Sequence, residues 1–557
     1  MKTKLLYGAL LTTLMSVSSL TGCGAKSGAD KYDKNGRLIL ELSNVYFGGS
    51  NEESIPAYDG ADTYTELLNE KFGVTIKPSA PSYGSWDEDV SRTITGRSLK
   101  DVAHYNVKAY NFGTSYEQWV RRMDIKALPD DLSSWPNLQK MLKNISNLDA
   151  LKINDKLYGI PIANDISNPG KDFSNMTYVY RRDWAKAIDE LNAGNPEYQP
   201  ILKENDVYTW EEFERLLRAF KTYVDSTSVN NDVVLIDQPW GFPSITNFYK
   251  KAPHCFSKDA SEKAVNNFTT DEYIEGLEKA QSFVTDGLYP KEQFLYTEEN
   301  DNAYKKYSAG LAGVFYDNFS FTNYGKLRRA LKKNKDVTNV DDAVAFLKVK
   351  GPKDNKFALE GTENWFSMTM FNYDISEKKM NKILDIIDYL LSEEGTRLAV
   401  YGQEGYDYNI VNDKVVLTDT GWEKDPNDLS GKTYIYKSNG AKSLRYMATL
   451  GNDYKDYDPY TGADMEAYTA VTTWQNEMKD AKTANNLRVV QEPADLSWMS
   501  TPTKNESTEK LLKKSKAYGT QYCYKQPIET RDDYIAAVNG VEEWADTLKE
   551  MNQKLGK

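Results

Sequence analysis

Strand-like and helix-like segments alternate along most of this chain, and their order limits the folds that it can adopt. Residues 37–42 read as a first strand, residues 64–72 carry apolar side chains at helical spacing up to Gly73, and residues 74–76 read as the next strand. The same succession recurs further along the chain. A repeated strand, helix, strand order is typical of α/β proteins with parallel sheets and disfavours a β-sandwich.

Two later helices have start signals in the sequence. Thr209 stands three residues before Glu212, and Thr269 stands three residues before Glu272, so each pair can form a capping box. Apolar residues at helical spacing follow both pairs. We interpret these stripes as core-facing, because charged residues occupy the other face of each helix.

The N-terminal segment reads as an export signal. A basic start is followed by an apolar run that ends in Leu-Thr-Gly-Cys at residues 20–23. The run is short for a transmembrane helix and is interrupted by Ser and Thr, whereas its basic start and its exit through small residues suit a cleaved signal peptide.

The residues at this exit resemble the lipobox of bacterial lipoproteins. The resemblance implies that residues 1–22 are removed and that Cys23 carries a diacylglyceryl group, with palmitate as a typical acyl chain. Two acyl chains hold a protein stably at a membrane. Residues 23–36 are then expected to be a flexible tether. The protein is expected on the extracellular face of the cell membrane, or on the periplasmic side where there are two membranes.

Composition limits the partners of the exported part. Without residues 1–22, 67 basic side chains stand against 82 acidic ones, a formal charge of −15. This balance disfavours nucleic acid as a partner, because nucleic acid requires a basic surface. The chain also holds 39 Tyr and 11 Trp. Aromatic rings build cores, but they also form flat surfaces on which the C–H faces of sugars can rest.

The histidines and cysteines give little support to metal or redox chemistry. The only histidines are His104 and His254, and neither a CxxC nor an HExxH spacing occurs, so no metal and no other cofactor is expected. Cys255 and Cys523 could form one disulfide or remain two free thiols.

No GxSxG or phosphate-loop motif indicates an enzyme. A glycoside hydrolase needs only two carboxylates, which composition leaves open.

Several motifs occur in an order that resembles one protein family. The first is Asn-Asp-Lys-Leu-Tyr-Gly-Ile-Pro at residues 154–161, in which Asn-Asp suits a tight turn. Tyr-Val-Tyr-Arg-Arg-Asp-Trp at 178–184 and Tyr-Thr-Trp-Glu-Glu-Phe at 208–213 follow it. Residues 271–294 and 309–316 resemble further family segments, as do the Leu-Ser-Glu-Glu-Gly and Tyr-Gly-Gln-Glu-Gly elements within 389–405. Together they resemble the family 1 extracellular solute-binding lipoproteins of bacterial ABC carbohydrate importers.

This resemblance implies a periplasmic-binding-protein-like α/β fold, with two lobes joined by a hinge and a ligand cleft between them. Lobe 1 is expected to comprise residues 37–161 and 352–405, and lobe 2 residues 162–351 and 406–557. The implied function is to capture a carbohydrate and to deliver it to the permease subunits of an ABC transporter, as a monomer and without enzymatic activity. The length of the chain favours an oligosaccharide. A peptide as the solute stays an alternative.

Loops that follow strands supply the expected ligand contacts. Tyr316 and Asp317 follow the strand that leads into the cleft in the family that the chain resembles. Trp184 and Trp210 are instead expected in the core. Ordinary packing is the alternative for each aromatic residue. No EF-hand spacing supports a structural calcium ion. The predicted ligand-binding residues are Tyr46, Trp86, Tyr105, Asn106, Trp240, Tyr316, Asp317 and Trp365.

Overall fold

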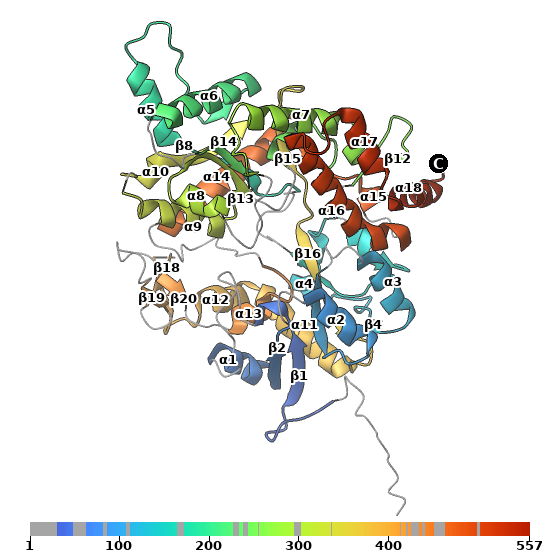
Figure 1. The fold of residues 1–557 in the computed structure, drawn as a ribbon. Helices are drawn as coiled ribbons and strands as arrows, with labels where there is room; N and C mark the ends of the chain where they lie inside the picture. The colour runs from blue at the N-terminus through green and yellow to red at the C-terminus, as the bar shows by residue number, and fades with distance from the viewer. Residues whose placement is uncertain are drawn as a thin grey trace, which may run out of the picture.

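The computed structural model describes residues 30–557 with internal gaps, and its described residues form two α/β lobes, one above the other in Figure 1. The two-lobed α/β architecture predicted from the sequence is confirmed. The gaps are residues 48–62, 82–85, 107–111, 147, 164–171, 227–232, 238–242, 254, 294–301, 336, 413, 419–421, 425–433, 437–439, 451–462 and 498–501.

The first sheet forms the centre of lobe 1 and consists of β1 (Leu38–Ser43), β2 (Val74–Ser79), β3 (Val102–Asn106), β4 (Ile125–Lys126), β7 (Ile160–Ala163) and β16 (Trp365–Asn372). The strand order is β2, β1, β3, β16, β4, and β7 also pairs with β16. β1 is parallel to β2 and β3, whereas β16 is antiparallel to β3, β4 and β7.

The second sheet forms the centre of lobe 2 and consists of β8 (Met176–Arg181), β9 (Val207–Tyr208), β10 (Val233–Asp237), β13 (Ala312–Asn318) and β14 (Val344–Val349). The strand order is β10, β13, β8, β14, β9. β10 and β13 are parallel, and β8 is antiparallel to both of its neighbours. The sheets are therefore mixed rather than purely parallel. β16 and β8 are the reversed strands because each begins where the chain arrives from the other lobe.

Helices cover both sheets (Figure 1). Lobe 1 carries α1 (Thr63–Phe72), α2 (Trp86–Thr95), α3 (Phe112–Arg121), α4 (Pro136–Lys143), α11 (Glu377–Leu391), α12 (Glu393–Tyr401) and α13 (Gly440–Arg445). Lobe 2 carries α5 (Arg182–Asn192), α6 (Trp210–Ser226), α7 (Asp271–Thr285), α8 (Asn302–Ser308), α9 (Phe321–Lys332), α10 (Val340–Ala343) and α14 (Ala463–Thr483). The last helices are α15 (Ala494–Ser497), α16 (Pro502–Tyr524), α17 (Arg531–Asn539) and α18 (Glu543–Lys554).

Short ribbons and 3-10 turns complete the described fold. The paired ribbons are β5 (Lys152–Ile153) with β6 (Lys156–Leu157), β11 (Phe256–Lys258) with β12 (Ala264–Asn266), β15 (Phe357–Glu360) with β21 (Leu487–Val490), β17 (Tyr408–Val411) with β18 (Lys414–Leu417), and β19 (Trp422–Lys424) with β20 (Tyr434–Tyr436). The 3-10 turns are η1 (Val45–Phe47), η3 (Leu148–Leu151), η4 (Ser244–Phe248) and η5 (Asn267–Thr269).

One of the two predicted capping boxes is confirmed. Glu212 accepts from the backbone N of Thr209 at 2.9 Å, and Thr209 Oγ1 accepts from the backbone N of Glu212 at 3.3 Å, so α6 starts as predicted. The other prediction is wrong by one residue. Thr270 caps α7 by accepting from the backbone N of Tyr273. Thr269 instead ends η5.

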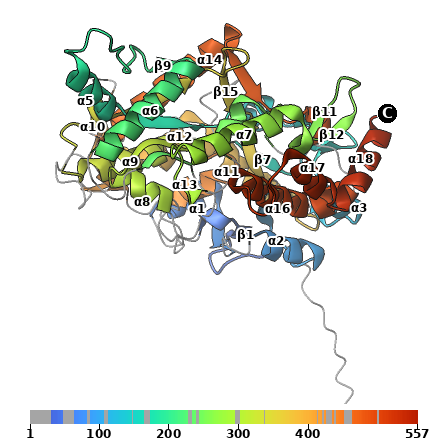
Figure 2. The same ribbon diagram turned by 45° about the horizontal axis from the view of Figure 1, so that its top comes forward.

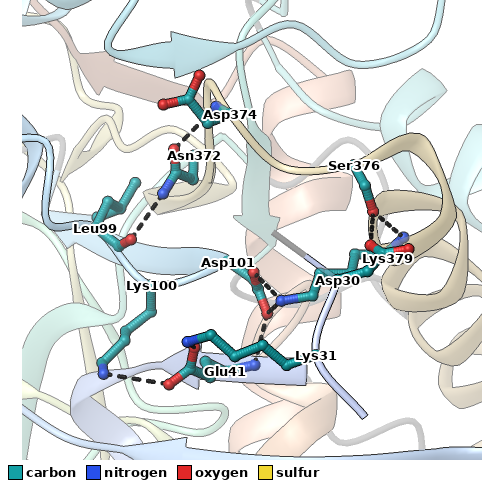
Figure 3. Close-up of polar contacts among 10 residues, drawn as sticks. All are labelled: Asp30, Lys31, Glu41, Leu99, Lys100, Asp101, Asn372, Asp374, Ser376 and Lys379. Carbon is teal, nitrogen blue, oxygen red and sulfur yellow. Dashed lines mark hydrogen bonds and ion pairs between the residues drawn. The ribbon is translucent and has the colours of Figure 1, made fainter. Parts of the chain in front are cut away.

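The folded body begins before residue 37, although residues 23–36 were expected to be a flexible tether. Tyr32 pairs with Leu38 in a β-bridge, and Asp33 accepts from the backbone N of Arg37 at 2.9 Å and from Thr75 Oγ1 at 2.7 Å. Ser376 Oγ donates to Asp30 Oδ1 at 2.5 Å (Figure 3). The described chain is therefore attached to lobe 1 from Asp30 onward.

A buried ion pair joins α11 to the first sheet (Figure 3). Lys379 Nζ lies 2.8 and 3.0 Å from the two carboxylate oxygens of Asp101, and both side chains are almost completely buried. Asp101 also accepts from the backbone N of Glu41 at 2.7 Å. Burial raises the pKa of Asp101, while the bond from Lys379 acts to lower it.

The C-terminal third of the chain contributes to both lobes, although residues 406–557 were expected in lobe 2. Ala441, Leu444 and Met447 belong to the core of lobe 1, and Tyr64 of α1 donates to Asp407 at 2.8 Å. From α14 onward the chain packs mainly on lobe 2, where α14 contacts α9 and α16 contacts α7, and α16 also contacts α3 of lobe 1. Figure 2 shows α16, α17 and α18 grouped at one end of that lobe. For Asp407 and these three core residues of lobe 1, the assignment to lobe 2 is therefore wrong.

The described structure also shows the state of the two cysteines and the location of two tryptophans. Cys255 and Cys523 are both buried and do not form a disulfide. Trp184 and Trp210 lie in a core cluster of lobe 2, as predicted. Among the described helices none is long and apolar enough to cross a membrane.

Candidate functional site

The carboxyl ends of the parallel strands in each sheet point toward the other lobe. β16 begins at Trp365, where the chain arrives from lobe 2, and its Ser367 is paired with Asn106, the last residue of β3. β8 likewise begins at Met176, where the chain arrives from lobe 1, and Met176 is paired with Asn318, the last residue of β13. Open α/β sheets bind ligands outside the carboxyl ends of their strands. The two sheets therefore direct their binding edges toward one another.

Three connecting segments join the lobes and meet at lobe 1. The first leaves β7 at Ala163, the second enters β16 at Trp365, and the third leaves lobe 1 after Thr449. Ala163 is paired with both Trp365 and Thr449. Its backbone N donates to Ala448 O at 2.9 Å, and its O accepts from Leu450 N at 2.8 Å. One residue thus holds the three connections side by side.

The first two connections are also paired where they enter lobe 2. Ser174 N donates to Glu360 O at 2.8 Å, and Thr362 N donates to Asp172 O at 2.9 Å. β15, which precedes Thr362, pairs with β21 of lobe 2. The chain therefore returns to lobe 1 after β15, several residues later than the expected boundary at 352. Any change in the angle between the lobes has to bend these paired segments.

Ser146 of lobe 1 holds the second connection just before β16. Its backbone N donates to Asn364 Oδ1 at 2.8 Å, and its Oγ donates to Glu363 Oε2 at 2.5 Å. The indole N of Trp365 donates to Ser146 O at 2.9 Å. Trp365 is completely buried in the core of lobe 1. It anchors the connection and is not available to a solute, so its predicted ligand role is wrong in this structure.

A pocket lies at the binding edge of the second sheet, where β15 crosses the ends of β8 and β14. Its wall is mostly aromatic and apolar and includes Tyr178, Phe248 and Trp474. Polar side chains, among them Asn247 and Tyr316, also line it, and Asn247 Nδ2 donates to Tyr316 Oη at 2.7 Å. The pocket therefore combines flat apolar surfaces with a hydrogen-bonding pair.

The Tyr316 hydroxyl keeps its proton in this environment. Burial raises the pKa of Tyr316 well above its ordinary value, and the nearby charge of Glu360 acts in the same direction. Glu360 itself accepts from Lys250 Nζ at 3.0 Å. Tyr316 is accordingly a neutral hydroxyl that can both donate and accept.

A buried network fixes η4, which carries Asn247, to the end of β10. Asp237 accepts from Ser244 N at 2.8 Å, from Ser244 Oγ at 2.7 Å and from Tyr289 Oη at 2.8 Å. Tyr178 Oη donates to Ser244 Oγ at 2.5 Å. Burial raises the pKa of Asp237 to about 6, although these hydrogen bonds oppose the shift. The network thus fixes the positions of Asn247 and Tyr178 in the pocket wall.

The other sequence-predicted residues are distributed differently. Tyr105 is fully buried in the core of lobe 1, with its ring edge-on to Trp119 at 5.0 Å, so the structure does not support its ligand role. Asp317 is buried at the end of β13, where its Oδ1 accepts from Asn318 N at 2.6 Å. Trp240 lies outside the described residues.

Three predicted residues have a described backbone but no described side chain. Tyr46 lies in η1 directly after β1, Trp86 begins α2 in the connection after β2, and Asn106 ends β3. Because β1, β2 and β3 are parallel, their carboxyl ends lie at one edge of the sheet. Tyr46 and Asn106 therefore stand at the carboxyl edge of the lobe 1 sheet, and their contact with a solute stays a prediction.

The sequence analysis missed Asn247, Phe248 and Trp474. Phe248 and Asn247 belong to a 3-10 turn, which has no periodicity to detect, and Trp474 lies on α14, in a C-terminal segment where no sequence motif marked a cleft residue. The only indication in the sequence is the segment Ile-Thr-Asn-Phe at residues 245–248, whose apolar residues suggest that the chain packs on the fold again shortly after Trp240. The described residues contain no group of three or more His, Cys, Asp or Glu side chains that could hold a metal ion.

Comparison with known proteins shows what the fold is. No family model and no curated protein matches the chain. A solved extracellular solute-binding protein from Bifidobacterium longum subsp. infantis matches with a TM-score of 0.64 at 15% identity, covering 95% of this chain and 100% of that one. This chain has the solute-binding-protein fold.

Two further solved structures show the same two-lobed fold. The alginate-binding protein AlgQ2 without calcium ion has a TM-score of 0.59 at 15% identity, with 96% of this chain and 100% of that chain covered. The S. pneumoniae ABC-transporter substrate binding protein FusA in complex with kestose has a TM-score of 0.54 at 15% identity, with 92% and 96% covered. At these identities the likeness is one of fold.

Proposed function

We propose that this protein is an extracellular solute-binding protein that captures a carbohydrate between its lobes and delivers it to an ABC transporter permease. The observation that carries the proposal is the opposed pair of binding edges, joined by three connections that meet at Ala163. Two of the similar structures are described as an alginate-binding protein and as a protein in complex with kestose. An oligosaccharide is the solute that we favour.

Capture would combine stacking with hydrogen bonding. The candidate contacts are Tyr46, Trp86 and Asn106 from lobe 1, and Trp240 and Asp317 from lobe 2. Sugars need polar partners for their hydroxyls and flat surfaces for their C–H faces, and these residue types supply both. Closure about the paired connections would bury the solute from both sides. No enzymatic activity is part of the proposal.

We infer a lipid anchor at Cys23 from the lipobox resemblance. The described chain is attached to lobe 1 at Asp30, beside the start of α11. Seven residues span about 25 Å at most when fully extended. The anchor would therefore hold this end of lobe 1 within about that distance of the membrane surface.

Thermal unfolding of the purified protein against mono- and oligosaccharides, with a peptide mixture beside them, tests the proposal. A solute at a hundred times its dissociation constant stabilises the folded state by about 2.7 kcal/mol, which raises the unfolding midpoint clearly. A shift with one sugar class supports the proposal. A shift with peptides alone replaces carbohydrate by peptide as the solute. Consumption of the sugar during incubation would indicate a glycoside hydrolase instead.

A further inference from the structure

The pocket beside β15 contains two polar groups whose hydrogen-bonding capacity is only partly used. Asn247 donates to Tyr316 Oη through Nδ2, while its Oδ1 is buried and has no hydrogen-bond partner among the described residues. An unsatisfied buried acceptor costs about 1–3 kcal/mol. In the described part of the chain, Tyr316 Oη accepts this bond and finds no acceptor for its own proton. The pair thus offers one free acceptor and one free donor.

This complementarity does not depend on how the Asn247 amide is oriented. If the amide is turned over, Tyr316 donates to Oδ1, and Nδ2 becomes the free donor while the Tyr316 oxygen keeps a free lone pair. Both arrangements leave one donor and one acceptor on two side chains that line the pocket. An alcohol, which donates once and accepts at its oxygen, is the complement of such a pair.

The size and walls of the pocket limit what can enter it. The free space is that of one or two water-sized groups, which is far less than a sugar ring needs. Phe248 and Trp474 form part of the wall. An occupant therefore has to be small, with one hydroxyl and an apolar part that can contact these rings.

The pocket lies at the edge of the second sheet where we expect the solute to bind. Its lining includes Met176, the first residue of β8, and Val349, the last residue of β14, so it lies at the edge of the sheet that points toward lobe 1. A group that projects from a solute held between the lobes can reach it from there.

We propose that the pocket receives one hydroxymethyl group of the bound carbohydrate. The hydroxyl of that group pairs with Asn247 and Tyr316, and its carbon lies against the aromatic wall. The inference rests on the proposed function and adds to it that the solute contains hexose units that carry a free primary hydroxyl, rather than pentose units.

The test uses sugar pairs that differ only in hydroxymethyl groups, one on each sugar unit. Cellotriose is compared with xylotriose, galactose with L-arabinose, and mannose with lyxose, by isothermal titration of the purified protein. We expect at least one hexose member to bind about 3- to 10-fold more tightly than its pentose counterpart, as one or two net hydrogen bonds would produce. In Tyr316→Phe, which keeps the ring, the preference should fall to about one. Asn247→Ser provides a second variant if Tyr316→Phe folds poorly.

Tyr180→Phe is the matched control. Tyr180 lies on β8, but its hydroxyl donates to Asp206 away from the pocket. Its loss should leave the preference unchanged. The inference is overturned if both members of every pair that binds do so equally, or if the preference persists in Tyr316→Phe. In either case the proposed function stands and the pocket holds only a fixed water. Binding of none of these sugars, with binding of peptides, overturns both.

Discussion

Ser146 and Asn364 hold each other across the boundary between lobe 1 and the second connection. Ser146 N donates to Asn364 Oδ1 at 2.8 Å, and Asn364 N donates to Ser146 Oγ at 3.1 Å. The single proton of the Ser146 hydroxyl is shared between Glu363 Oε2 at 2.5 Å and Asn364 Oδ1 at 3.0 Å. Asn364 Nδ2 also donates to Asn144 O at 2.6 Å. The second connection is thus attached firmly to lobe 1 at Asn364, so we expect any hinge bending on the lobe 2 side of this residue.

Replacing Ser146 by Ala should loosen this attachment. The substitution removes the bond to Glu363 and the two Oγ bonds with Asn364, and we expect the unfolding free energy to fall by about 1–3 kcal/mol. Hydrogen exchange of the backbone amides of residues 361–365 should accelerate. Ser226→Ala, at the exposed end of α6, is the control and should change neither quantity. Unchanged exchange in Ser146→Ala would contradict the role of Ser146 in attaching the second connection to lobe 1.

The buried pair of Lys379 and Asp101 gives a second prediction. Lys379→Met leaves the carboxylate of Asp101 buried without its cation, and breaking such a pair costs about 3–5 kcal/mol. Denaturant unfolding should measure this loss. Adding Asp101→Asn to Lys379→Met should recover part of it, because no uncompensated charge then remains. A double variant that is less stable than Lys379→Met alone would disagree with this account.

Asp237 gives a prediction about pH. Its folded-state pKa is raised to about 6 from an ordinary 3.8, so between these values the folded state binds more protons than the unfolded state. Its contribution to stability is therefore present at low pH and is lost as the pH rises from about 4 to about 6. A shift of this size corresponds to roughly 3 kcal/mol at most.

Urea unfolding of the protein and of Asp237→Asn across this range isolates the effect. The difference in unfolding free energy, protein minus variant, should decrease up to about pH 6 and then stay level. Other carboxylates, such as Glu66 and Glu212, have lowered pKa values and affect both proteins alike. A difference that does not vary with pH would show that Asp237 titrates normally.

Trp240 is predicted from the sequence to contact the solute. If it does, Trp240→Ala should weaken binding of the sugar identified by thermal unfolding by about 1–3 kcal/mol, without lowering the unfolding midpoint of the free protein. Titration calorimetry measures the first quantity and calorimetric scanning the second. Trp184→Ala, in the core of lobe 2, should do the reverse and destabilise the free protein. Unchanged affinity in Trp240→Ala would remove this residue from the site.

The sequence predicted backbone features better than side-chain roles. The turn at Asn154 and Asp155 was predicted from residue type, and both residues adopt positive φ angles, 51° and 60°, between β5 and β6. Such a turn depends on a few neighbouring residues, so local sequence specifies it. The start of α6 at the Thr209 box is confirmed for the same reason. The box at Thr269 failed because η5 ends at that residue and moves the cap to Thr270.

The roles of Trp365 and Tyr105 could not be predicted in this way. Both stand beside strand ends, where a solute contact is plausible, yet both side chains turn into the core of lobe 1. Trp365 does so because Ser146 O, 219 residues away in the chain, accepts its indole N–H. The residues around Trp365 in the sequence give no indication that Ser146 O will accept its indole N–H.

The sequence by itself determined the succession of strands and helices, the α/β class, and the chemistry available at the strand ends, because these follow from periodicity and residue type within short windows. The two lobes were implied by the resemblance to a known family. Tertiary structure alone decided which strands are reversed, where the chain crosses between the lobes, and that Asn247 meets Tyr316 from 69 residues away. The physical reason is that a buried polar group must find a partner wherever folding places one, and that partner is set by packing between segments rather than by neighbours in the chain.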